Sequence, residues 1–177
     1  MVATIEAKKL NLGCRTTRIP GFTNVDIRQD RNPDICTNAK DLSMVSSDSI
    51  EEIYSSNMLE HFSLLETVNV LKEWNRVLKK GGILWLSVPD FECIYRIYDK
   101  YKMLPLWALY HMYGEQHHEH AWHYTIFTWV NLQNYLMEAG FSSFTKLEKL
   151  PYLEDDCSNS TDSWTGELIS LNCKAVK

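Results

Sequence analysis

The sequence lacks the charge and cysteine patterns that mark two large classes of protein. Its formal net charge is -5, and no run of Lys and Arg is longer than two residues. A surface for nucleic acid needs a basic patch, so nucleic acid is not expected as a partner. The five cysteines are odd in number and form no C-x-x-C pair, which argues against a disulfide framework and against a zinc ribbon.

Long apolar runs are also missing. The amino terminus has no apolar segment of the kind found in a signal peptide, and no stretch approaches the length of a membrane-spanning helix. We therefore expect no membrane association and a cytoplasmic location. A chain of 177 residues with 45% hydrophobic residues can bury one core, which predicts a single domain over residues 1–177.

Short strands alternate with helical patterns along the chain. Residues 64–78 repeat apolar side chains at helical spacing, and Lys79, Lys80 and Gly81 are typical of a helix end. A second helix is predicted at 128–139, ended by Gly140. Strands are predicted at 8–13, 22–27, 33–37, 50–55, 83–88, 142–148 and 168–175.

This order predicts an α/β fold of the Rossmann-like type, with a mostly parallel central sheet and a C-terminal antiparallel hairpin. The apolar run at 83–88 favours a central strand covered by helices on both faces, with Trp74 and Trp85 in the core. The acidic segment 154–166 is expected to be a solvated loop. Ligands of such sheets bind beyond the carboxyl ends of the strands.

Five segments in this order resemble a known family. They are KLNLGC, GFTNVD, SSNMLEHF, EWNRVLKKGGILWLSVPDFE and HYTIFTWVNLQNYLMEAGF. Together they are similar to class I methyltransferases that use S-adenosylmethionine, and in particular to the compact bacterial-type group with LNLGC, NVD, LEHF and VLKKGG. The resemblance implies that S-adenosylmethionine is the cofactor. It also implies methyl transfer to a small-molecule or glycan acceptor, which we expect to occur at oxygen.

The resemblance also indicates which residues would bind the cofactor. Asn11, Gly13 and Cys14 belong to the first motif, where a glycine turn lets the backbone approach a ligand and would present amide groups to the methionine carboxylate. An ordinary tight turn is the alternative. Asp26, at the end of the second strand, would accept hydrogen bonds from the ribose hydroxyls, or it is simply a solvated aspartate.

Three further residues follow from the same resemblance. Asp41 would contact the adenine amino group while Leu42 packs on the ring, although Asp41 could equally be a capping residue in a loop. Asn57 would face the methionine part of the cofactor, with the N-cap of a helix as a second role. Glu60 and His61 follow closely and are expected at the rim of the same cleft.

The sequence departs from the family pattern in two places. Arg15 stands where the family usually has glycine, and it would either crowd the turn or supply a cation near a carboxylate. The link between the first two strands is too short for a helix. These departures motivate a second hypothesis, in which the chain binds S-adenosylmethionine but acts as a catalytically impaired partner or regulatory module.

The segment 91–127 is the expected lid over the acceptor. Residues 91–129 hold 11 of the 21 Phe, Trp and Tyr residues. These side chains could form an aromatic wall, pack as two amphipathic helices on the sheet, or form the surface of a homodimer. The oligomeric state is left open.

The same region carries histidines that suit two kinds of chemistry. His123, and after it His61, are the candidate bases for an acceptor hydroxyl, since histidine titrates near neutral pH. The stretch GEQHHEHAWH also suggests a His-rich metal-binding protein on the same fold, with His120 and His123 at helical spacing. Because methyl transfer from a sulfonium needs no Lewis acid, no metal ligand is assigned, and the stretch is expected to be a solvated or substrate-facing His/Glu loop.

Overall fold

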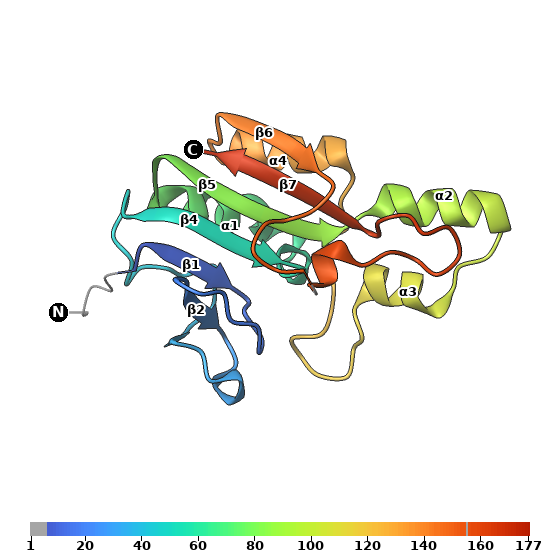
Figure 1. Cartoon of the computed structure of the whole chain (residues 1–177), viewed down its shortest axis with the longest axis horizontal. Helices are drawn as coiled ribbons and strands as arrows, with labels where there is room; N and C mark the ends of the chain where they lie inside the picture. Colours follow the sequence, from blue (N-terminus) through green and yellow to red (C-terminus); the bar gives the residue numbers. More distant parts are fainter. Residues whose placement is uncertain (1–6, 155) are drawn as a thin grey trace.

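The computed structural model describes residues 7–154 and 156–177. Its centre is a seven-stranded sheet with the order β3-β2-β1-β4-β5-β7-β6 (Figure 1). All neighbouring strands pair in parallel except β7, which is antiparallel to both β5 and β6. The strands are β1 (Lys9–Leu12), β2 (Thr23–Asp26), β3 (Ile35–Cys36), β4 (Ile50–Ser56), β5 (Leu78–Pro89), β6 (Ser143–Leu147) and β7 (Ser170–Val176). The expected Rossmann-like α/β fold with a C-terminal antiparallel pair is confirmed.

Two helices cover one face of the sheet. They are α1 (Leu64–Val77) and α4 (Trp129–Glu138), which lie behind the strands in Figure 1. Their apolar sides pack on alternate residues of the strands, so Leu71, Trp74 and Leu136 are fully buried together with Leu10 and Leu84. The other two helices, α2 (Phe91–Tyr101) and α3 (Leu106–Tyr113), extend beyond the carboxyl end of β5.

The opposite face differs from the prediction of helices on both sides. None of the described helices covers it. A second, smaller cluster of loop and strand side chains lies there instead, with Phe22, Tyr54 and Leu150 buried. Trp85 packs against this cluster only partly buried, so its assignment to the main core is wrong. The cause is the short chain between β1 and β2, which has no room for a crossover helix.

The end of α1 also differs from the prediction. The helix stops at Val77, and Leu78 is already extended and paired with Ile50 as the first residue of β5. Gly81 therefore does not cap the helix. Its positive φ of 77° lies inside β5, near the irregularity in the pairing of β4 with β5. A strand that follows a helix without a loop leaves no position for a glycine cap.

The segment 154–166 is less solvated than expected. Within its described residues a short 3₁₀ helix, η3 (Cys157–Asn159), places Ser158 in the interior. Asp162 is 4% exposed because it accepts hydrogen bonds from the backbone amides of Trp164, Thr165 and Glu167. Among the described residues, no helix is long and apolar enough to cross a membrane.

Candidate functional site

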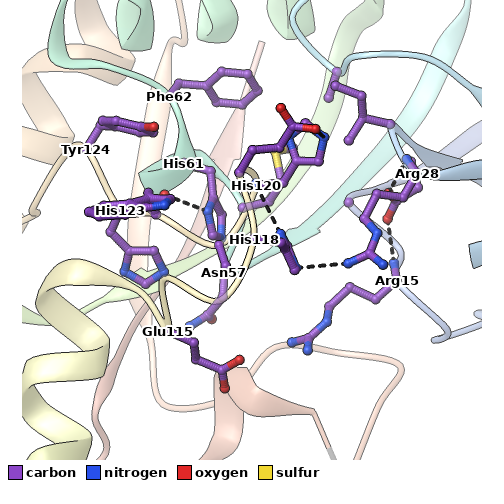
Figure 2. Close-up of a pocket in the computed structure, with 18 of the residues that line it drawn as sticks. Arg15, Arg28, Asn57, His61, Phe62, Glu115, His118, His120, His123 and Tyr124 are labelled. Atoms are coloured by element: carbon purple, nitrogen blue, oxygen red, sulfur yellow. Dashed lines mark hydrogen bonds and ion pairs between the residues drawn. The ribbon is translucent and has the colours of Figure 1, made fainter.

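A cavity of about 580 Å³ lies where the carboxyl ends of the parallel strands meet the segment 110–124 (Figure 2). The residues that follow β1, β2, β3 and β4 form one wall, and the segment 110–124 forms the other. Gly13, Asp26 and Asn57 all line this cavity, as do His61 and His123. The sheet thus brings together residues that the sequence motifs place far apart along the chain.

The turn after β1 approaches its neighbours closely. Gly13 has a φ of +68°, and a Cβ atom at this position would lie 2.5 Å from Cγ of Met58. Only glycine fits this turn without displacing Met58. The expected free amides are not found, because the backbone N–H groups of Gly13 and Cys14 both donate to the carbonyl of Val25, at 2.9 and 3.2 Å. This turn therefore cannot present those two amides to a carboxylate.

Asp26 ends β2 and is 7% exposed. Its Oδ2 atom accepts the amide of Arg15 and its Oδ1 atom accepts the amide of Arg28, each at 2.9 Å. Each carboxylate oxygen keeps a further lone pair that can accept from a ligand. The two backbone bonds hold the carboxylate in one orientation at the cavity wall.

Three arginines line the cavity near Asp26, namely Arg15, Arg28 and Arg31, and Nε of Arg31 lies 3.9 Å from Oδ2 of Asp30. Arg28 is fully engaged, since it pairs with Asp30 at 2.6 Å and its Nη1 atom lies 2.9 Å from Nε2 of His118. The guanidinium of Arg15 makes no hydrogen bond or ion pair with any described side chain, and Figure 2 shows it directed into the cavity. Arg15 also has a φ of 49°, an uncommon conformation for a residue with a side chain.

Asn57 follows β4 with a φ of 47° and lines the cavity. Its backbone N–H donates to the carbonyl of Ser87, and its side-chain Oδ1 atom accepts from the hydroxyl of Ser87 at 3.3 Å. It does not cap a helix, so the alternative role is wrong. The residue that caps α1 is Ser63, which forms a capping box with Glu66.

The four other cofactor candidates do not line this cavity. Asn11 is 3% exposed on β1, where its side chain donates to the carbonyl of Thr17 and to Oδ1 of Asn24, and it borders a smaller pocket together with Cys14. Asp41 is exposed and accepts the amide of Ser43. Leu42 is buried in the core. In the loop after β3, the residues that line the cavity are 37–40.

Glu60, His61 and His123 form a compact group at the inner end of the cavity. Glu60 and His61 belong to the 3₁₀ helix η2 (Leu59–His61). The carbonyl of Glu60 accepts the amides of Tyr124 and Thr125, which holds the segment carrying His123 against η2. The two imidazole rings meet edge to face with centroids 4.7 Å apart. His123 is thus held beside His61, as Figure 2 shows.

Burial dominates the electrostatics of this group. It lowers the pKa of His61 to about 4, and it also lowers the pKa of His123, so both rings are neutral at pH 7. It raises the pKa of Glu60 to about 8. The expectation that Glu60 lies at the rim is wrong, because its side chain is fully buried.

Residues 12–86 match the model of a methyltransferase domain family. Known structures extend the likeness to the rest of the chain. A methyltransferase from Archaeoglobus fulgidus that depends on S-adenosylmethionine superposes with a TM-score of 0.63 at 14% identity, covering 97% of this chain and 86% of its own. The fold is that of class I methyltransferases.

Two further structures have this methyltransferase fold. A protein from Thermotoga maritima, described as a possible histamine N-methyltransferase, has a TM-score of 0.59 at 19% identity, covering 98% of this chain and 83% of its own. The 1,6-didemethyltoxoflavin-N1-methyltransferase from Burkholderia thailandensis, with bound S-adenosylhomocysteine, has a TM-score of 0.57 at 14% identity, covering 97% and 71%. A comparison with curated protein sequences gives no match.

Within this methyltransferase fold the His-rich stretch is not helical. Residues 114–125 form turns and extended chain, as expected for a His/Glu loop, so His120 and His123 are not a helical pair. His120 lies beside Glu119, whereas His123 turns toward Glu60. Tyrosines of α2 and α3 are largely exposed, so they do not pack on the sheet, and of these only Tyr110 lines the cavity.

Sequence reasoning missed several residues of the cavity in the methyltransferase fold. Arg28, Lys40 and Phe62 line it but were not singled out. Arg28 lies two residues after Asp26, the acid at the end of the second predicted strand. This position could have predicted that Arg28 lines the same cavity. Phe62 follows His61 directly in LEHF, so its motif also marks it.

Proposed function

We propose that this protein is a methyltransferase that uses S-adenosylmethionine to methylate a hydroxyl oxygen of a small-molecule or glycan acceptor. The observation that carries the proposal is the convergence of Gly13, Asp26 and Asn57 on one cavity at the ends of β1, β2 and β4. The match of residues 12–86 to a methyltransferase domain supports it.

The residues of the cavity fit this cofactor. Asp26 has lone pairs left for the two ribose hydroxyls after accepting its two backbone amides. At Gly13 a Cβ atom would collide with Met58, which also lines the cavity, so glycine keeps the shape of this wall. Residues 37–40 would border the adenine, and Asn57 would face the methionine part. Asn11, Cys14, Asp41 and Leu42 would then act by shaping the surrounding loops.

Arg15 takes the role that the amides of Gly13 and Cys14 cannot fill. Those amides are bonded to Val25, whereas the Arg15 guanidinium has no partner among the described residues and faces the cavity. A guanidinium can bind a carboxylate through two parallel hydrogen bonds. We therefore assign binding of the methionine carboxylate to Arg15. The arginine that replaces the usual glycine of the family would thus contribute to cofactor binding.

Once bound, the cofactor supplies a methyl group activated by a positively charged sulfur. The protein has to align the acceptor, exclude water and remove the hydroxyl proton. The Nε2 atom of His123 is the base that we propose, with His61 beside it as the second candidate. Both rings line the cavity and are neutral at pH 7, so each has a free lone pair for that proton, and the pKa of about 4 makes His61 the weaker base.

The test has two parts. Calorimetry with S-adenosylhomocysteine is expected to show one site per chain, and methyl-labelled S-adenosylmethionine is expected to label a component of small-molecule or glycan pools. His123→Gln should abolish most labelling while S-adenosylhomocysteine still binds. Binding without any labelled product would favour the impaired, regulatory module instead, and absence of binding would overturn the proposal.

A further inference from the structure

Three side chains of the ligand type converge next to the proposed acceptor site. Glu60, His61 and His123 each offer one ligand atom, and these atoms all lie within 4.8 Å of one another. Nε2 of His123 lies 3.9 Å from Oε1 of Glu60. The cluster joins two parts of the chain that are distant in sequence, so no motif with a fixed spacing predicts it.

Both imidazoles are held in the same tautomer. Nδ1 of His61 lies 2.9 Å from the carbonyl oxygen of Trp122, and Nδ1 of His123 lies 2.8 Å from that of His111. A carbonyl only accepts hydrogen bonds, so each Nδ1 carries the proton and each Nε2 keeps its lone pair. Histidines that bind metal ions are commonly oriented in this way, by a bond from the other ring nitrogen to a backbone carbonyl.

The third member of the cluster lacks a partner. Glu60 is fully buried, and neither carboxyl oxygen has a hydrogen-bond partner among the described residues. A buried group without partners lowers the stability of the fold, because its hydrogen bonds to water are lost on folding and no protein hydrogen bond replaces them. A cation next to Glu60 would supply the missing interaction.

We propose that Glu60, His61 and His123 bind a divalent transition-metal ion of the zinc class. Two imidazoles and one carboxylate suit such ions. Tetrahedral bonds of about 2.1 Å space the ligand atoms about 3.4 Å apart, so only small side-chain rotations are needed from the observed distances. His61 and His123 line the cavity while Glu60 lies behind them, so the open coordination position faces the acceptor.

Charges around the cluster act in both directions. Arg15 and His118 face His61 from the other side of the cavity and disfavour added positive charge there. On the side of His123, His111 disfavours added positive charge and Glu115 favours it. The buried carboxyl of Glu60 is closer than any of these because it belongs to the ligand set itself, and it would release its proton when the ion binds.

The catalytic consequence rests on the proposed function. The ion would take the lone pair of His123 Nε2, so in the metal-bound protein that ring is a ligand, and the role of base proposed above applies to the metal-free protein. An acceptor hydroxyl bound to the ion loses its proton to water more readily. Its oxygen then forms the bond to the methyl carbon as the carbon–sulfur bond breaks, and that electron pair stays on sulfur. Metal binding itself does not depend on this reaction.

The experiment titrates Co²⁺ into the full chain after removal of metals with a chelator. We expect one equivalent to bind with visible absorption bands of low-symmetry Co²⁺, and Zn²⁺ to displace it. His123→Gln and Glu60→Gln should each weaken Co²⁺ binding by at least about 100-fold, because changes in outer-shell partners alone cost 10- to 100-fold. Thermal unfolding checks that both variants are folded. His117→Gln, in the exposed part of the same segment, is the matched control and should bind Co²⁺ like the unchanged chain.

Two results would overturn the metal site. One is the lack of stoichiometric Co²⁺ binding by the unchanged chain. The other is binding that survives in His123→Gln but is lost in His117→Gln, which would place the ion on the exposed loop. S-adenosylhomocysteine binding, measured on the same samples, separates the two proposals: if it persists while Co²⁺ does not bind, only the metal site fails.

Discussion

The Oδ2 atom of Asp26 accepts a hydrogen bond from the backbone amide of Arg15 at 2.9 Å. This bond connects the loop after β1 with the end of β2, and it fixes both beside the cavity. The loop that would hold the methionine part and the acid that would hold the ribose are therefore one unit. A change in Asp26 should affect cofactor binding both directly and through that loop.

Asp26→Asn is the first prediction. An asparagine side chain has one acceptor oxygen in place of two, so one backbone amide and one ribose hydroxyl lose their partner. Hydrogen bonds to charged groups contribute about 1.5–3 kcal/mol, which predicts roughly 10- to 100-fold weaker binding of S-adenosylhomocysteine by calorimetry. Asp48→Asn, an exposed acid that pairs with Lys177, should leave the affinity unchanged. Equal affinities in Asp26→Asn and the unchanged chain would exclude Asp26 from the site.

The two glycines at either end of the β1–β2 link provide the second prediction. Gly13 and Gly21 both have positive φ, but a Cβ atom would collide with Met58 at Gly13 and would meet open space at Gly21. Gly21→Ala should cost about 1 kcal/mol of unfolding free energy through backbone strain alone, with normal S-adenosylhomocysteine binding. Gly13→Ala should cost more, about 2 kcal/mol or above, and should weaken binding because Met58 borders the cavity.

Urea unfolding and calorimetry on both alanine variants distinguish these effects. If both variants lose the same stability and bind equally well, then the close approach of Gly13 to Met58 has no bearing on the site.

Local features of the sequence predict part of the site, whereas contacts between distant segments do not follow from them. Gly13 and Asp26 could be predicted because strand ends and turns are local features, and parallel strands bring their carboxyl ends to one edge. The pairing of Glu60 with His123 could not, since it depends on a non-helical segment folding back onto η2 through the amides of Tyr124 and Thr125. No local periodicity records such a contact.

The face of the sheet that lacks helices could not be predicted for a similar reason. The continuous apolar run at 83–88 in β5 predicts two buried faces, but which elements cover them depends on the length of each crossover. Trp85 was assigned to the core because it lies in an apolar run, whereas it donates its indole N–H to Glu52 on the face without helices. The sequence shows that the link between the first two strands is too short for a crossover helix. It does not show that Trp85 would therefore lie on a face that no helix covers.

A pH-dependent prediction comes from the start of α1. Hydrogen bonds from Lys40 and Ser63 lower the pKa of Glu66 to about 2. The ionised carboxylate therefore stabilises the folded state above its ordinary pKa near 4.5, and this contribution is lost as the pH falls from there toward 2. Glu66→Gln should cost about 1 kcal/mol at pH 7, as expected for a capping box on a partly exposed site.

Urea unfolding of Glu66→Gln at pH 7 and at pH 3 tests this prediction. The difference in unfolding free energy from the unchanged chain should narrow at pH 3. Glu138→Gln, whose carboxylate lies 3.8 Å from Lys72 at an exposed position, should differ from the unchanged chain by less than about 0.5 kcal/mol at either pH. A constant difference across the pH range for Glu66→Gln would mean that its charge is irrelevant.

Arg15→Gly should change stability and affinity in opposite directions. The residue adopts a left-handed φ of 49°, which costs a non-glycine residue about 1 kcal/mol, so glycine should keep or raise the unfolding free energy. The same change removes the guanidinium that we assign to the methionine carboxylate, and S-adenosylhomocysteine should bind about 10-fold more weakly or worse. Arg15→Lys keeps the charge and should retain part of the affinity.

The ligand provides the decisive control for Arg15. 5′-Methylthioadenosine shares the adenosine and the thioether of S-adenosylhomocysteine but has no carboxylate. If Arg15 binds that carboxylate, Arg15→Gly should weaken S-adenosylhomocysteine while leaving the affinity for 5′-methylthioadenosine unchanged. An equal loss for both ligands would instead indicate that Arg15 shapes the turn, because a distorted turn also displaces Asp26 and weakens every ligand that has a ribose.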